Sequence, residues 1–201
     1  MSNRWLWPAI LIVVIIAIGS SIAGTYNSLV ALDQSVQVQW AQVQTVYQRR
    51  ADLIPNLVAT VKGVAGFEKS TYIAVAQARS KVGQIAPLQV QNLPNSPQAF
   101  AQFQRAQDGL SAALSRLLAV VENYPDLKAN QNFLDLQAQL EGTENRIAVE
   151  RRRYNESARA FNVKRQTFPT NLVASLFGGR FPLKPYFQAQ PGAENAPTVQ
   201  F

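Results

Sequence analysis

A heptad repeat in the second half of the chain constrains the fold more than any other feature. Large apolar residues stand at every seventh position over 36 residues: Phe133, Leu140, Ile147, Tyr154, Phe161 and Phe168. A strict seven-residue spacing keeps one face of an α-helix apolar and favours left-handed supercoiling against partner helices. We therefore expect one long helix over residues 130–167, packed along its length against other helices.

Three further segments show helical periodicity. We expect helices over residues 24–48, 53–83 and 96–123, each with an apolar stripe that needs a partner. Short connections between long helices favour antiparallel neighbours. The sequence thus predicts an all-α fold with an antiparallel up-down four-helix bundle over residues 24–168. An intermolecular coiled coil is the alternative that the heptad alone leaves open.

The first connection is predicted at residues 49–52. Arg49 and Arg50 suit the last turn of a helix. Asp52 is a common N-cap residue, and Pro55 is tolerated in a first helical turn. These residues predict a helical hairpin here. Gly63 and Gly66 predict a bend or a close helix crossing in its second arm.

The C-terminal part lacks helical periodicity. We expect a short amphipathic helix over residues 169–179, and a proline-rich, partly disordered tail over residues 180–201. Between the second and third helices, residues 84–95 form an uncharged connection with two prolines, after which Ser96 is predicted to cap the third helix.

An uncharged apolar segment begins the chain. Residues 5–23 approach the length of about 20 residues that a bilayer-spanning helix needs, and two tryptophans at its start suit a membrane interface. This pattern predicts a transmembrane anchor over residues 5–23 behind a short flank of residues 1–4. A cleaved signal peptide is the alternative, because Ser21 and Ala23 form a small-x-small site.

The charges around this segment predict its orientation. Arg4 and the α-amino group precede it, whereas Asp33 is the next charged residue after it. Positive charge favours the cytoplasmic side, so the bundle is expected to face the periplasm or extracytoplasmic space. The short flank also predicts that no cytoplasmic output domain is present.

The composition argues against an enzyme. The sequence contains no Cys and no His, which removes thiol nucleophiles, the most frequent general base and the most frequent zinc ligand. Glu141 and Glu144 lie on one helical face, but such pairs are most often surface charge. We therefore expect no catalytic residues, no cofactor and no metal site.

The net charge of +7 is concentrated in one stretch. Residues 146–184 hold nine basic and two acidic residues, which equals the entire net charge. In an up-down bundle this end returns toward the membrane, so a lipid or partner surface is predicted; a solvated helix face is the alternative. The candidate residues are Arg151, Arg152, Arg153, Arg159, Lys164, Arg165, Arg180 and Lys184.

Aromatic-Asn pairs recur at Tyr26-Asn27, Tyr154-Asn155 and Phe161-Asn162. Asn27 and Asn155 would meet if the first and fourth helices lay side by side in that register. The alternative is buried aromatic rings with neighbouring amides that are satisfied elsewhere.

Several motifs resemble the LemA family of bacterial membrane-anchored proteins. They are Tyr26-Asn27-Ser28-Leu29-Val30, the stretch from Arg49 to Val58, Tyr124-Pro125-Asp126-Leu127-Lys128-Ala129-Asn130, the stretch from Thr143 to Ile147, Arg153-Tyr154-Asn155 and Phe168-Pro169. The resemblance covers residues 26–187. It implies a single-pass protein of the bacterial inner membrane with a long four-helix bundle and no established activity.

The expected function combines these observations. The resemblance implies a scaffold or partner-binding accessory in envelope or membrane-protein homeostasis, with a membrane protease system as one partner and a homo-oligomer as another. An extracytoplasmic sensor or ligand-binding bundle is the alternative. Nucleic-acid binding, which the basic charge alone would suit, is disfavoured because an extracytoplasmic domain does not meet nucleic acid and no aromatic-basic stacking motif is present.

Overall fold

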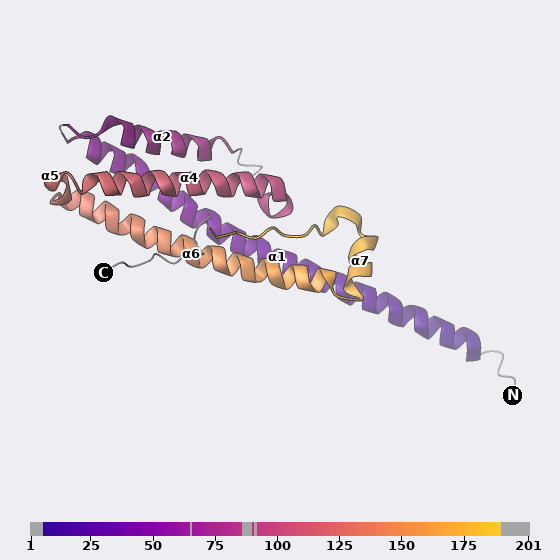
Figure 1. Cartoon of the computed structure of the whole chain (residues 1–201). Coiled ribbons are helices and arrows are strands. Elements are labelled where there is room, and N and C mark those ends of the chain that lie inside the picture. Colours follow the sequence, from indigo (N-terminus) through magenta and orange to yellow (C-terminus); the bar gives the residue numbers. More distant parts are fainter. Residues whose placement is uncertain (1–5, 65, 86–89, 91, 190–201) are drawn as a thin grey trace, which may run out of the picture.

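The computed structural model describes residues 6–64, 66–85, 90 and 92–189, and these residues form helices without strands (Figure 1). Four long helices alternate in direction: α1 leaves the N-terminus, α2 runs back, α4 runs outward and α6 returns beside α1. The elements are α1 (Leu6–Lys62), α2 (Lys69–Gly83), η2 (Leu93–Asn95), α4 (Pro97–Val121), α5 (Pro125–Lys128), α6 (Gln131–Gln166), α7 (Thr170–Leu176) and η3 (Gly178–Arg180).

Helix α1 is a single helix of 57 residues, so the predicted hairpin at residues 49–52 is wrong. Pro55 lies inside this helix and cannot donate to the carbonyl of Ala51, one turn earlier. Arg79 of α2 supplies the missing donor, because its Nε lies 3.2 Å from that carbonyl oxygen. The proline is thus accommodated by a neighbouring helix and does not end α1.

The chain reverses between the end of α1 and the start of α2, where Gly63 and Gly66 lie. Gly66 has a φ of +79°, a left-handed conformation that glycine adopts without steric cost. The hydroxyl of Tyr124 donates to the Gly66 carbonyl at 2.9 Å and holds this turn against the start of α5. The two glycines therefore form the hairpin turn itself and not a bend within a helix.

The heptad repeat of α6 lines the bundle core. Phe133, Leu140, Ile147, Tyr154 and Phe161 are buried, as the repeat predicts. Phe168 is 74% exposed, because α6 ends at Gln166. The core divides into two apolar clusters, one around Trp40 in the middle of α1 and one around Leu57 near its C-terminal end.

The connection before α4 is tied to α1. The Trp40 indole donates to the carbonyl oxygen of Val90 at 2.8 Å, and Leu93 and Pro94 are buried. Ser96 caps α4, accepting from the Ala99 amide at 3.4 Å. Residues 86–89 and 91 lie outside the described part of this connection.

The N-terminal part of α1 projects beyond the bundle (Figure 1). It is long and apolar enough to cross a membrane, and its large side chains from Trp7 to Ile18 are between 49% and 77% exposed. Helix α7 packs against α1 where the projection begins, since the rings of Phe177 and Tyr26 lie 4.6 Å apart.

The first part of the tail predicted for residues 180–201 is packed against the bundle. Phe181, Lys184 and Phe187 are buried in the bundle, so residues 181–189 form an extended strap along it. Residues 190–201 lie outside the described part of the chain.

Candidate functional site

The eight candidate basic residues do not form one surface. Five of them are exposed along α6 and η3, whereas Arg151 and Arg165 are half-buried and Lys184 is 2% exposed. Arg165 donates through Nε to the carbonyl of Phe181. The exposed residues are Arg152, Arg153, Arg159, Lys164 and Arg180.

Arg151 contributes to the interior of the bundle. Its Nε donates to the Tyr47 hydroxyl at 2.6 Å, and its Nη2 lies 3.0 Å from Asp108. Burial raises the pKa of Tyr47 above its ordinary 10.0, and the neighbouring Arg151 opposes that rise. Arg151 therefore links α1, α4 and α6, and only 17% of its side chain is exposed toward the predicted lipid or partner surface.

Lys184 is also internal. Its ammonium lies 2.5 Å from the Asp33 carboxylate and 2.6 Å from the Asn95 side-chain oxygen, and it sits 4.8 Å from the centre of the Phe161 ring. The assignment of Lys184 to an exposed surface is corrected for the same reason: the strap turns this side chain into the bundle.

The end of the bundle beside the apolar projection carries an apolar surface. Phe168, Leu172, Leu176 and Phe177 are 74%, 57%, 72% and 43% exposed on and next to α7. Thr170, Val173 and Ala174 on the opposite side of α7 are buried. We call the four exposed residues the α7 apolar face; the exposed cations Lys164 and Arg180 lie near it in the chain.

Arg50 joins three helices in the middle of the bundle. Its side chain is fully buried, and its Nη1 lies 2.7 Å from both Ser111 on α4 and Glu144 on α6. Its Nη2 also contacts the buried Gln107 side chain. Arg50 thus connects α1, α4 and α6 inside the bundle. It is not the helix-end residue that its neighbours in the sequence predict.

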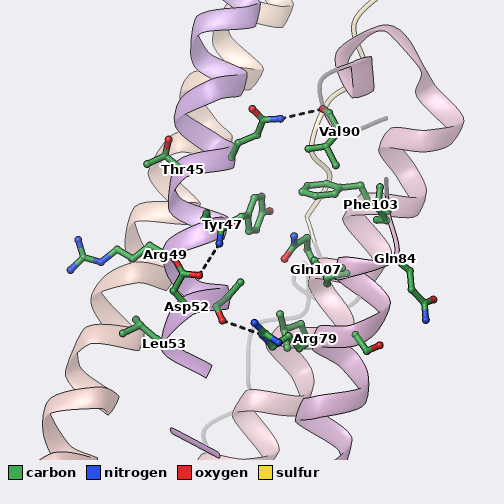
Figure 2. A pocket seen from close by; sticks show the side chains of 18 of the residues that line it. Thr45, Tyr47, Arg49, Asp52, Leu53, Arg79, Gln84, Val90, Phe103 and Gln107 are labelled. Carbon is green, nitrogen blue, oxygen red and sulfur yellow. Dashed lines mark hydrogen bonds between the residues drawn. The ribbon is translucent and has the colours of Figure 1, made fainter. Parts of the chain in front are cut away.

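A groove opens between α1, α2 and α4, with a volume of about 1460 Å³. Figure 2 shows Arg49, Asp52, Arg79 and other polar side chains around it. Asp52 accepts from Gln48 at 2.7 Å, so the groove offers side-chain amides, cations and one carboxylate to a bound group. These are hydrogen-bonding groups suited to recognition.

The two remaining predicted sites have structural partners. Glu144 pairs with Arg50, whereas Glu141 accepts from Gln137 at 2.9 Å. Asn155 is bonded to the backbone of Phe187 and does not meet Asn27, which is exposed on α1. Among the described residues, no cluster of three or more Asp or Glu side chains is placed to hold a metal ion.

Sequence reasoning missed the strap contacts, although a signal for them is present. Phe181, Lys184 and Phe187 stand at every third position, and the first two are each followed by a proline, at 182 and 185. The polyproline II helix has three residues per turn. A search for the periodicity of an α-helix or a β-strand does not detect such a repeat.

Comparison with known proteins identifies relatives over most of the chain. The sequence model of the LemA family matches residues 39–201. Magnetosome protein MamQ 2 of Paramagnetospirillum magneticum is 26% identical, with 90% of this chain and 71% of the relative covered. Magnetosome protein MamQ of Magnetospirillum gryphiswaldense is also 26% identical, covering 92% and 73%. Protein LemA of Metamycoplasma hominis is 28% identical, covering 75% and 64%. With the helical architecture described above, this match shows that the chain belongs to the LemA family.

Proposed function

We propose that this protein is a membrane-tethered, non-enzymatic scaffold that holds a partner-binding helical bundle against the bilayer surface, in service of envelope or membrane-protein homeostasis. The observation that carries the proposal is the continuity of α1. One helix contains both the exposed apolar segment and the outer wall of the bundle. A helix without a break transmits the position of the anchor to the bundle, so the bundle has a fixed height and axis relative to the membrane.

The position of α7 supports contact with lipid. Tyr26, which touches α7, lies three residues after Ala23, or about 4.5 Å along the helix. The headgroup layer on each side of the hydrocarbon core is thicker than this distance. The α7 apolar face therefore lies at interface depth, where exposed Leu and Phe side chains gain free energy by entering the acyl boundary.

The distance from the membrane anchor separates the exposed basic residues into a distant group and a near group. Tyr154 contacts Trp40, which lies about 25 Å along α1 from Ala23. Arg152 and Arg153 are next to Tyr154 and are thus more than two Debye lengths from the membrane at physiological salt. Lys164 and Arg180, near α7, are the cations placed to attract anionic headgroups.

A fluorescence experiment tests the membrane contact. The sequence contains no Cys, so Leu176→Cys in the full chain gives one labelling site for an environment-sensitive fluorophore. In proteoliposomes we expect a blue-shifted emission that is quenched by acyl-chain nitroxide lipids. The matched control is Leu134→Cys, 40% exposed at the opposite end of α6. Equal quenching at the two positions, or none at either, would contradict the proposal.

Partner binding is tested from the groove in Figure 2. A photo-crosslinking residue in place of Gln48, exposed at the groove, should form adducts with a membrane or envelope protein in intact cells. The same residue in place of Arg152, 72% exposed on α6, is the control. Adducts of equal yield from both positions, or from neither, would contradict a partner site at the groove.

A ligand-binding or sensor bundle is the second candidate, and the volume of the groove favours it. The two candidates differ in what the groove binds. A small ligand would raise the melting temperature of the purified protein without a partner protein, whereas the scaffold requires protein adducts.

A further inference from the structure

The strap is held in the bundle as a peptide is held in a binding groove. Side-chain amides bind both backbone groups of single strap residues. Asn162 donates to the Lys184 carbonyl at 2.8 Å and accepts from the Lys184 amide at 2.9 Å. Asn155 makes the same pair of bonds with Phe187, each 2.9 Å long. These contacts recognise an extended backbone whatever its side chains.

A third amide binds from the other wall of the groove. Gln104 of α4 donates to the carbonyl of Gln188 at 3.0 Å and accepts from its amide at 3.3 Å. The strap backbone is therefore read from two helices, α6 and α4. Helix packing does not require such paired amide contacts, because helices satisfy their own backbone groups.

Three pockets receive every third side chain of the strap. Phe181 lies between Tyr26 and Phe161, with ring centres 5.5 and 6.4 Å away. Lys184 enters the pocket of Asp33 described above.

Phe187 fills the third pocket. Its ring centre lies 4.7 Å from that of Phe100, 5.4 Å from that of Tyr154 and 6.2 Å from that of Trp40. Leu183 and Tyr186, between the pockets, are 44% and 42% exposed. Three strap side chains thus enter pockets, whereas Leu183 and Tyr186 between them are partly exposed; the Tyr186 hydroxyl also accepts from Asn162 at 2.9 Å.

The pocket spacing matches polyproline II geometry. Tyr26, Asp33 and Trp40 are seven residues apart on α1, as are Asn155 and Asn162 on α6. Seven helical residues advance about 10.5 Å, and three polyproline II residues advance about 9.3 Å. A heptad repeat therefore presents one pocket for each turn of a polyproline II peptide.

We propose that the groove between α1, α4 and α6 is a recognition site for a polyproline II peptide of a partner protein, with an aromatic residue, a lysine and a second aromatic residue at every third position. Residues 181–187 occupy the site in cis. This site is separate from the groove between α1, α2 and α4 in Figure 2, and its existence does not depend on the membrane anchor.

The link before the strap provides a release point. Gly178 and Gly179 are exposed, and Gly178 has a φ of +58°. The link is short and consists of η3, so it keeps the strap at an effective concentration of about 1 mM. For a peptide with an intrinsic Kd of about 10 µM, this cis competitor weakens apparent binding in trans by about a hundredfold.

The test separates the strap from its groove in the full-length protein. A protease site is inserted between Gly179 and Arg180, the protein is cut in detergent micelles, and the released segment is removed. A fluorescein-labelled peptide of residues 181–188 is then titrated by anisotropy. We expect binding to the cut protein about a hundredfold tighter than to the uncut protein. A peptide with Lys184→Glu and Phe187→Ala is the specificity control.

A second variant avoids the cut. Lys184→Glu in the full chain places a carboxylate against Asp33 and should open the strap, so that the variant binds the wild-type peptide tightly. Adding Asn155→Ala and Asn162→Ala should abolish that binding.

Three results would overturn the proposal. The first is a cut and an opened protein that both keep their helical circular dichroism but bind no peptide. The second is equal binding of the control peptide. The third is loss of the helical fold on both cutting and opening, which would show that the strap is an integral part of the core.

Discussion

The buried Arg50–Glu144 pair makes an asymmetric prediction about stability. Arg50 is fully buried, whereas the side chain of Glu144 is 40% exposed. Removing either residue deletes the same 2.7 Å contact, but the charge that remains is in a different environment. Glu144→Ala leaves a buried guanidinium without its counter-charge. Arg50→Met leaves a carboxylate that water can reach.

The expected loss of stability depends on which charged or polar group is left without its partner. Removing one partner of a buried ion pair, so that the other charge stays buried without a counter-charge, costs about 3–5 kcal/mol. The Nε of Arg50 already has no partner among the described residues, so Glu144→Ala is placed in this range. Arg50→Met preserves side-chain volume and costs about 1–2 kcal/mol, chiefly because the buried Gln107 side chain loses its partner.

Thermal unfolding of the full-length protein in a nonionic detergent, followed by circular dichroism, measures both variants. For a chain of this size, 1 kcal/mol corresponds to about 2–4 °C in Tm. We expect Tm to fall by about 6–20 °C for Glu144→Ala and by about 2–8 °C for Arg50→Met. The double variant should resemble Arg50→Met, because no buried charge is left. Equal or greater loss with Arg50→Met would refute the reasoning.

Four further changes have defined outcomes in the same unfolding assay. Gly66→Ala should cost about 1–2 kcal/mol, because alanine is strained at a φ of +79°. Ser96→Ala should cost about 1 kcal/mol through loss of the α4 N-cap. Arg79→Ala should cost about 0.5–1.5 kcal/mol, because it leaves the Ala51 carbonyl without a donor. Burial raises the pKa of Tyr154 above its ordinary 10.0. The unfolded chain therefore releases this proton at a lower pH than the folded chain does. The free energy of unfolding then falls as pH rises above 10, by up to about 1.4 kcal/mol per pH unit. Tyr154→Phe should flatten that decline and be nearly neutral at pH 7, since the Tyr154 hydroxyl has no partner among the described residues; an unchanged alkaline slope would contradict this assignment.

The sequence predicts burial along helices better than it predicts where helices end. The seven-residue repeat identifies the buried positions of α6 because helical geometry alone places them on one face. The exposed Phe168 shows the limit: its spacing continues the repeat, but α6 ends two residues earlier. A periodicity carries no information about the residue at which it ceases to be helical.

The misplaced hairpin has a tertiary cause. A proline within a helix costs about 3 kcal/mol, which locally favours a break before Pro55. Ile54, Leu57 and Val61 are buried beyond that point, and each contributes about 1.5–3 kcal/mol by leaving water. Arg79 restores a donor for the freed carbonyl. These gains come from α2, α4 and α6, so local capping rules do not contain them.

The strap shows how two different periodicities become one interface. Its prolines fix φ near the polyproline II value at positions 182 and 185 and restrict the residues before them, so Lys184 is pre-ordered before it binds. Phe181, with a φ of −121° and a ψ of 69°, lies outside the polyproline II region. The groove between α1, α4 and α6 forms independently of the strap, because the heptad repeats of α1 and α6 fix the positions of its pockets. Because the advance per polyproline II turn is close to that per heptad, two partners that are ordered separately fit in register with little entropy to lose. The two advances differ by about 1.2 Å per repeat, so the mismatch would exceed a hydrogen-bond tolerance after a few repeats. A recognised peptide should therefore span about three pockets, which is the number that Phe181, Lys184 and Phe187 occupy.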